Sequence, residues 1–361
     1  LATYTLTASV QDGLGTVSPA WGTYYKGQIV ELTAQIQNGY VITGWSGTID
    51  DGSTSLTNRA VVDGDKTVTV KVRKQQVLYV GGSAAYNSLS EAVDKAQDGD
   101  IIIVNPGLYQ STSSTALNIE TWLSFGGKRL IVRGSNPEDP ETVQNTILDH
   151  HGLELVGLKE GSLIEGLTFR QSNVIIVRSA LFIRNCRFVS CNWYGGIGET
   201  PPGCAQDGVN GGSVEGAAVE ISESSVHFIG CLFEGNSAFG GDGTNGNGGC
   251  DSHPDGGDGG WPGWAYGGAV SCQFSSETTF ENCTFRDNYV LGGNGGNGGN
   301  GNGPPNDGYG GLGGGWNYSD QVEIGWLIQR GWDGWQNGDK YDYPLTYFEM
   351  YDWDTFAKWF E

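Results

Sequence analysis

A tripeptide that ends in phenylalanine recurs four times, and this repeat limits the possible fold more than any other feature of the sequence. Its first residue is Leu once and Cys three times, and the copies are 19, 45 and 52 residues apart. Removing glycine-rich inserts at 192–214 and 239–266 reduces the two long spacings to 22 and 24 residues. A period of about 19–24 residues with short strands predicts a β-solenoid, whose turns pack on their neighbours. The copies lie at 167–169, 186–188, 231–233 and 283–285.

Strand alternation predicts which side chains of each turn face the interior. The four terminal phenylalanines are expected to form an inward-facing aromatic stack. Three cysteines share one inward position, and a fourth aligns with Ile221, so we expect buried thiols that pack as small apolar groups. No Cys-x-x-Cys spacing supports zinc binding. The residues concerned are Phe169, Phe188, Phe233 and Phe285, and Cys186, Cys231, Cys283 and Cys272.

Charge excludes several classes of partner. The 361 residues include 41 acidic and 19 basic side chains, a net charge of −22. Nucleic acids and anionic membrane surfaces need a basic face, so neither is an expected partner. No apolar run approaches the roughly 18–20 residues of a membrane span, so we expect no membrane insertion. The chain begins at Leu1, which fits a mature secreted protein whose signal peptide has been removed and equally a chain trimmed at its start.

Glycine is concentrated in three inserts, at 192–214, 239–266 and 292–315. They begin at the same point of successive turns, so we expect them to project from one edge and to stack. Such tracts are commonly flexible linkers. The alternative is a bundle of polyproline-II-like segments, in which glycine at close-approach positions lets the backbones bond to each other. An ordered bundle would form a surface for ligands, partners or further copies of the chain.

Residues 88–96, with an N-cap serine and one apolar face, predict a short helix before the strand at 101–104. This run resembles the N-terminal cap of right-handed parallel β-helix proteins of the pectate-lyase-like superfamily. Phe-x-x-Asn at 233–236 and 285–288 and Gly-Gly-Ala-Val at 267–270 are similar to coils of the polymorphic outer-membrane-protein and adhesin group. The resemblance, over about 78–291, implies a right-handed parallel β-helix and indicates little about activity.

The Phe-x-x-Asn motifs also place two asparagines at equivalent turns. Asn236 and Asn288 are expected to hydrogen-bond along the stack, whereas Ser172 and Cys191 occupy the position in earlier turns and leave the asparagine ladder incomplete.

Residues 1–74 contain short alternating strands separated by glycine turns. Segments such as Val30-Glu31-Leu32-Thr33-Ala34 and Gly39-Tyr40-Val41-Ile42-Thr43-Gly44-Trp45 resemble the internalin-type B-repeat, a small β-grasp-like module of bacterial surface and secreted proteins. The resemblance implies a spacer or binding module rather than a catalyst. Trp45 is interpreted as a core residue, with a ligand platform as the alternative.

Few side chains form a catalytic pattern. Asp149, His150 and His151 are the one compact titratable group suited to general acid–base work, and a solvated turn is the simpler interpretation. Superfamily lyases use Arg or Lys as base, which Arg170 could supply, yet no cluster of carboxylates stacks beside it. The Gly-His-Gly and Arg-x-Lys motifs of the hydrolytic pectinases are absent.

The glycine inserts carry two further candidates. Four aspartates among glycines suit calcium, a hard cation that prefers oxygen ligands, and calcium is the one cofactor considered. Cys204 and Cys250 lie in neighbouring inserts, so a disulfide between stacked loops is expected. The candidate ligands are Asp242, Asp251, Asp255 and Asp258.

The tail at 316–361 is rich in aromatic residues. It is interpreted as packing on the glycine inserts or on the edge of the last coil, with a sugar-stacking surface or a subunit interface as alternatives. Its candidate binding residues are Trp316, Trp326, Trp332, Trp335 and Trp353.

The sequence therefore predicts an all-β protein: a β module over 1–74, a parallel β-helix over 78–315 and a tail over 316–361. The favoured function is a non-catalytic extracellular structural or adhesive protein that assembles through its glycine-rich loops and tail. Its partners would be copies of itself, other surface proteins or polysaccharide. The alternative is a secreted polysaccharide lyase or glycoside hydrolase.

Overall fold

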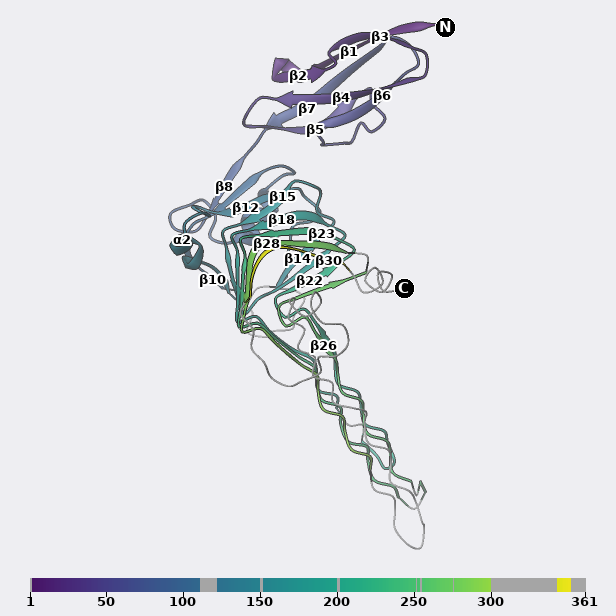
Figure 1. The fold of residues 1–361 in the computed structure, drawn as a ribbon, viewed down its shortest axis with the longest axis vertical. Coiled ribbons are helices and arrows are strands. Elements are labelled where there is room, and N and C mark those ends of the chain that lie inside the picture. Colours follow the sequence, from purple (N-terminus) through teal and green to yellow (C-terminus); the bar gives the residue numbers. More distant parts are fainter. Residues whose placement is uncertain are drawn as a thin grey trace.

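The computed structural model is mostly β, with few helices. An N-terminal β module, a central stack of parallel strands and a narrow glycine-rich bundle follow one another along the long axis (Figure 1). The structure describes residues 2–110, 122–149, 152–199, 202–250, 252–253, 255–274, 276–299 and 343–351.

The N-terminal module consists of two small sheets packed on one apolar core. Alternating strand residues such as Leu6 and Leu32 fill this core. Trp45 is buried there and its Nε1 donates a hydrogen bond to the Ser55 carbonyl at 3.0 Å, which confirms its interpretation as a core residue. One sheet has the order β3 (Trp21–Tyr25), β1 (Thr3–Val10), β7 (Lys66–Lys74), β5 (Tyr40–Ser46). The other has the order β2 (Gly15–Ser18), β4 (Gln28–Ile36), β6 (Thr57–Val62), and a 3-10 turn, η1 (Gln11–Gly13), follows β1.

A buried ion pair joins this module to the parallel strands. Arg73 Nη1 lies 2.7 Å from Asp100 Oδ1, and the aspartate side chain is fully buried. The same oxygen accepts the Gln76 N–H at 2.9 Å, and Gln75 Nε2 donates to the Gly99 carbonyl at 2.7 Å. The link between the two parts is therefore short and held by charge-assisted hydrogen bonds.

The central part is dominated by a large parallel sheet, accompanied by a smaller one. One column of the large sheet is β8 (Val77–Val80), β9 (Ile101–Val104), β12 (Ile131–Gly134), β15 (Ser162–Glu165), β18 (Ala180–Arg184), β23 (Ser225–Ile229) and β28 (Glu277–Arg286). The other column, which also ends on β28, is β10 (Gly107–Gln110), β13 (Thr146–Asp149), β16 (Thr168–Arg170), β19 (Arg187–Val189) and β24 (Leu232–Glu234). The smaller sheet is β11 (Trp122–Ser124), β14 (Gly152–Val156), β17 (Asn173–Val177), β22 (Val219–Ser222) and β27 (Val270–Gln273).

Two short helices and one antiparallel strand accompany these sheets in the described residues. Helix α1 (Leu89–Lys95) begins at Ser88, whose side chain accepts the Glu91 N–H, and it buries Leu89, Ala92 and Val93. This confirms the helix predicted at 88–96. Helix α2 (Pro140–Asn145) is capped by the Asp139 carboxylate. Strand β30 (Tyr343–Tyr351) pairs antiparallel with β28.

Phenylalanines stack through the core, as the repeat predicts. Phe169, Phe188, Phe233 and Phe285 occupy one register position of successive strands. Neighbouring rings lie 4.9, 4.8 and 4.5 Å apart and are tilted by 9° or less. Each turn therefore buries one aromatic ring against the ring of the next turn.

Polar ladders hold the turns between these strands. At one corner, each of four side chains donates to a carbonyl oxygen of the preceding turn, and Asn236 Nδ2 also donates to Asn288 Oδ1 at 2.8 Å. The predicted asparagine stack is thereby confirmed. The ladder is more complete than the sequence indicates, because serine and cysteine make the same bond. The donors are Ser172 to Leu148 (3.1 Å), Cys191 to Phe169 (3.7 Å), Asn236 to Phe188 (3.0 Å) and Asn288 to Phe233 (3.0 Å).

A second ladder consists of buried cysteines. Cys186 Sγ faces the Ile164 carbonyl at 3.9 Å, and Cys231 Sγ faces the Ile183 carbonyl at 3.4 Å. Cys186, Cys231 and Cys283 are all buried, as predicted for thiols that serve as small apolar groups. Cys272 pairs with Ile221 as expected, but it is only partly buried, so the prediction of burial is wrong for this cysteine. Burial raises the pKa of Cys186 to about 12, which keeps it protonated.

Short paired strands frame the glycine-rich inserts. Strands β20 (Asn192–Tyr194), β25 (Ser237–Phe239) and β29 (Tyr289–Leu291) pair in parallel where the inserts begin, and β21 (Val214–Glu215) pairs with β26 (Ala265–Tyr266) where two of them end. The glycine tracts proper are thus narrower than the predicted inserts, at 195–213 and 240–264, and the third is described as far as 299.

Main-chain hydrogen bonds join the glycine tracts into the bundle of Figure 1. The donors follow a step of three residues, which is the period of a polyproline-II helix. A methyl group on Gly260 would overlap the Val209 carbonyl oxygen, so the close approach requires glycine there. Of the two alternatives for the inserts, the described residues take the ordered one. Representative bonds run from Gly208 N to Asp258 O (2.7 Å), Gly211 to Trp261 (2.9 Å), Gly260 to Thr244 (2.9 Å) and Gly296 to Gly260 (2.8 Å).

Candidate functional site

Three places in the described residues are candidate sites. They are the side of the glycine bundle, an aspartate on the parallel sheet, and a pocket at the base of the bundle. The first follows directly from the bundle's three-residue period. Between 257 and 264 one residue in three is exposed, and the two residues between successive exposed positions are buried. Trp261 and Trp264 take two of these exposed positions, at 60% and 54% exposure, so the bundle presents a pair of aromatic rings on a hydrogen-bonded main chain.

Side chains of the bundle also satisfy its outer backbone groups. Asn210 Oδ1 accepts the Trp261 N–H at 2.8 Å, and Ser213 Oγ accepts the Trp264 N–H at 3.0 Å. The two tryptophans are therefore anchored through their own amides while their rings remain exposed. This combination suits a surface that binds without rearranging.

Far along the bundle, two cysteines form a disulfide. Cys204 and Cys250 are bonded, with their Cα atoms 5.9 Å apart, in the pairing expected from the sequence. His253 lies beside them, and a ligand atom of each of the three residues falls within 4.8 Å of the others. The bond joins two inserts and closes a loop with a sequence separation of 46.

The candidate calcium ligands do not form a cluster of three in the part of the chain that the structure describes. Asp242 Oδ1 accepts hydrogen bonds from the backbone and side-chain amides of Asn294, at 2.6 and 3.0 Å. This carboxylate therefore serves to pair two glycine tracts. Asp255 and Asp258 are described, whereas Asp251 lies outside the described residues.

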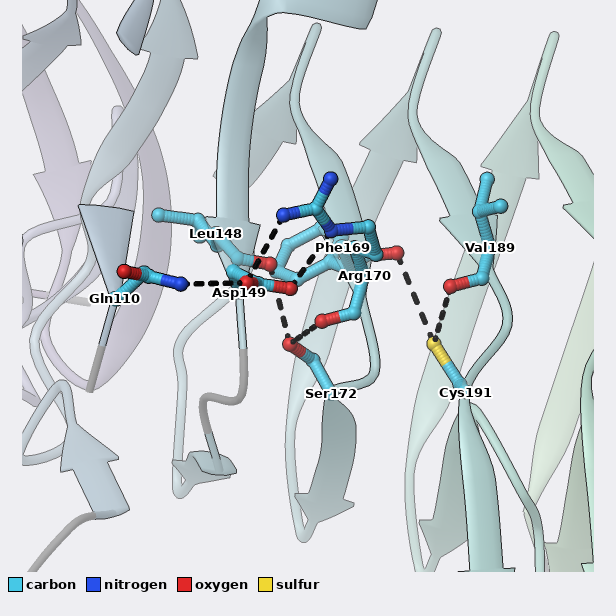
Figure 2. Close-up of polar contacts among 8 residues, drawn as sticks. All are labelled: Gln110, Leu148, Asp149, Phe169, Arg170, Ser172, Val189 and Cys191. Carbon is cyan, nitrogen blue, oxygen red and sulfur yellow. Dashed lines mark hydrogen bonds and ion pairs between the residues drawn. The ribbon is translucent and has the colours of Figure 1, made fainter. Parts of the chain in front are cut away.

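Asp149 is engaged in an ion pair (Figure 2). Arg170 Nε and Nη2 donate to its two carboxylate oxygens at 2.8 and 3.0 Å, and Gln110 Nε2 donates to Oδ2 at 3.1 Å. The aspartate side chain is 2% exposed, whereas that of Arg170 is 40% exposed. The carboxylate in turn raises the pKa of Arg170 through the hydrogen bond.

Residues Gln110, Asp149 and Arg170 stand side by side on β10, β13 and β16. Further along the same row, Arg286 on β28 pairs with Glu234 on β24. The row therefore stabilises neighbouring strands through complementary charges, and Asp149 would have to release Arg170 before it could transfer a proton. His150 and His151, the other two catalytic candidates, lie outside the described residues.

A pocket of about 200 Å³ lies where the bundle meets the smaller sheet. Asn173 on β17, Glu220 on β22, Glu215 on β21 and Trp193 on β20 contribute to its lining. Gln273 Nε2 donates to Glu215 Oε2 at 2.6 Å. Among the described residues, the Glu220 carboxylate has neither a hydrogen bond nor an ion pair.

The two carboxylates of this pocket repel each other. Burial, and after it the charge of Glu215, raises the pKa of Glu220 above its ordinary range. Sequence reasoning missed this site because its residues come from strands on both sides of the first glycine insert. One signal was available: two glutamates flank the motif Gly216-Ala217-Ala218-Val219, which marks a turn between outward-facing positions.

The tail residues proposed for binding, Trp316, Trp326, Trp332, Trp335 and Trp353, lie outside the described residues, as does most of the segment that carries them.

Comparison with protein families gives one finding. Residues 4–75 match the model of the divergent InlB B-repeat domain. This segment coincides with strands β1 to β7, and it confirms the resemblance of the N-terminal module to the internalin-type B-repeat. Comparison with curated proteins and with solved structures gave no match. Within the described residues, no helix has the length and apolar character that crossing a membrane would require.

Proposed function

We propose that this protein is a non-catalytic extracellular structural or adhesive protein built on a right-handed parallel β-helix. The parallel columns, the stacked phenylalanines and the corner ladders support successive turns of such a helix, with α1 as the cap of its first turn. B-repeat domains occur in surface proteins. The Cys204–Cys250 disulfide agrees with an oxidising compartment.

In this proposal, the glycine bundle is the binding surface. One observation carries it: a main-chain-bonded bundle, fixed to the parallel sheets, presents the exposed rings of Trp261 and Trp264. Residues three apart in a polyproline-II segment lie roughly 9 Å apart on one side. Flat exposed rings at such a spacing suit the apolar faces of sugar residues, and we propose polysaccharide as the partner.

Sedimentation with insoluble polysaccharides tests this function. The full chain is expected to bind at least one polysaccharide of the panel without releasing soluble sugar. Trp261→Ala together with Trp264→Ala should abolish that binding. The matched control is Trp21→Ala, which removes an equally exposed tryptophan from the N-terminal module and should leave binding unchanged. Equal loss in both variants, or sugar release by the wild type, would refute the proposal.

The second candidate function, a polysaccharide hydrolase, rests on the Glu215–Glu220 pair. A carboxyl group with a raised pKa beside a carboxylate is the arrangement that glycosidases use. The volume of the pocket argues against a hydrolase, because about 200 Å³ is smaller than the roughly 300–1,000 Å³ of ordinary ligand pockets. Reducing-sugar release by the wild type but not by Glu220→Gln would establish this function instead.

A further inference from the structure

We propose that Glu215, Glu220 and Asn173 form a calcium site that ties the base of the glycine bundle to the smaller parallel sheet. The site differs from the aspartates of the glycine inserts, and the proposal does not depend on what the bundle binds.

Uncompensated charge is the first argument. Among the described residues, the pocket lining includes two carboxylates and no basic residue. Glu215 receives a hydrogen bond from the neutral amide of Gln273, and Glu220 receives none among the described residues. Two adjacent carboxylates in a half-buried pocket repel each other, and a divalent cation between them would turn that repulsion into attraction.

The second argument is an independent one, from Asn173. Asn173 is one of the residues that line the pocket, it is only 5% exposed, and its Oδ1 is buried without a hydrogen-bond partner in the described residues. The amide orientation is fixed, because Nδ2 donates to the Gly216 and Ala217 carbonyls at 3.0 and 3.4 Å. A buried carbonyl oxygen without a partner is costly, and a cation ligand is a role that would compensate for it.

The chemistry of these donors selects the ion. All three are oxygen donors, and two are carboxylates that can bind one metal through one or both oxygens. Calcium takes six to eight oxygen ligands in flexible geometry, so water would complete its shell, whereas zinc prefers nitrogen and sulfur. A pocket of about 200 Å³ has space for one ion and several waters, at roughly 30 Å³ each.

The three ligands come from strands on two sides of the junction. Glu215 ends the first glycine insert on β21, while Asn173 and Glu220 belong to β17 and β22 of the smaller sheet. A shared ion would cross-link the bundle to the sheet. Calcium should therefore stabilise the junction rather than the aromatic core.

Tryptophan-sensitised terbium luminescence tests the site on the full chain after removal of metal. Terbium replaces calcium at oxygen sites, and Trp193 in the pocket lining would serve as its antenna. We expect a saturable signal that calcium displaces. Glu220→Gln should weaken terbium binding by at least about tenfold, since it removes a charged ligand. Trp193→Phe should lower the signal while calorimetric calcium binding persists.

Glu154→Gln is the matched control. Glu154 stands at the same register position of the smaller sheet two strands away, and it is exposed. This variant should bind terbium as the wild type does, and so should Asp242→Asn. No saturable signal in the wild type, equal weakening by Glu154→Gln and Glu220→Gln, or loss with Asp242→Asn alone would each overturn the proposal. Calcium should also raise the melting temperature of the wild type and not that of Glu220→Gln.

Discussion

The parallel sheets and the glycine bundle stack the same successive turns of chain by opposite means. In the sheets, side chains fill the interior: Phe233 lies between Phe188 and Phe285 and is completely buried. In the bundle, closely packed glycine backbone takes the place of such side chains, since a methyl group at Gly260 would overlap a neighbouring carbonyl. Making a residue smaller should therefore destabilise the sheets, whereas making one larger should destabilise the bundle.

The largest effect is expected in the aromatic stack. Phe233→Ala removes a ring with contacts on both faces, and a buried Phe→Ala change costs about 3–5 kcal/mol. Chemical denaturation of the full chain measures this loss. Phe182→Ala is the control, because that ring lies on the outer face and is partly exposed. Equal losses in the two variants would mean that the ring stack does not hold the sheets.

Reduction of Cys204–Cys250 should loosen the bundle and leave the sheets intact. Closing a loop of this separation is worth about 4 kcal/mol on the chain-entropy model. After reduction, or in Cys204→Ser with Cys250→Ser, protease cleavage is expected within 202–250 while far-ultraviolet circular dichroism stays unchanged. Cys272→Ser provides the control with the disulfide retained. Unchanged cleavage after reduction would show that the bundle needs no covalent tie.

Adding a methyl group inside the bundle should lower the free energy of unfolding by less than removing a ring from the core does. Gly260→Ala forces the Val209 carbonyl aside, and overpacking of this kind costs about 1–3 kcal/mol. Local proteolysis rates across 202–264 measure it. Trp261→Ala, one residue away, has an exposed side chain and should leave these rates unchanged. If Gly260→Ala is as resistant as the wild type, the tracts are not closely packed.

The buried cysteines report on how tightly the sheets are closed. Burial raises the pKa values of Cys186 and Cys191 to about 12, so both remain thiols at pH 8. In the native protein, a thiol reagent should therefore label at most the half-buried Cys272 quickly, and all five free cysteines after unfolding. Rapid labelling of Cys186 in the native state would indicate that the sheets open readily.

The smallest expected effect is a change in melting temperature caused by Glu220→Gln at the junction between the bundle and the smaller sheet. The raised pKa of Glu220 means that its ionisation costs stability as pH rises through the folded-state value. In buffer free of divalent cations, Glu220→Gln should therefore raise the melting temperature at pH 7. Well below the ordinary glutamate pKa, both forms are neutral and the difference should vanish. Added calcium should reverse the order at pH 7, and an unchanged order would count against the calcium site.

The sequence predicts the sheets more completely than the bundle, and the reason is physical. Each turn places one buried ring at the same position of the repeat. The spacing of Phe169, Phe188, Phe233 and Phe285 therefore predicts their stack. The sequence also predicts that the inserts begin at the same point of successive turns. The sequence does not predict which tract bonds to which. A glycine donates its hydrogen bond through the backbone amide and has no side chain from which its partner could be predicted.

The pockets and charges were harder still to foresee. Asp149 stood out as a titratable group, yet only the register of β10, β13 and β16 reveals that Arg170 and Gln110 hold it. Glu215, Glu220 and Asn173 come together in the pocket lining because the first insert leaves after β19 and β20 and returns beside the smaller sheet, which already contains β17. Contacts of this kind depend on the path of the chain between distant segments.

Amide hydrogen exchange of the glycine tracts measures whether they form an ordered, hydrogen-bonded bundle. In the bundle, the N–H groups of Gly243, Gly246 and Gly296 are bonded to carbonyls of other tracts, and that of Gly260 is bonded to the Thr244 carbonyl of its own tract. We predict exchange within 240–264 that is slowed well below that of an unstructured peptide of the same sequence, and that becomes fast in Gly260→Ala. Exchange at the unstructured rate in the wild-type protein would contradict the account, because the glycine tracts would then be linkers rather than an ordered surface.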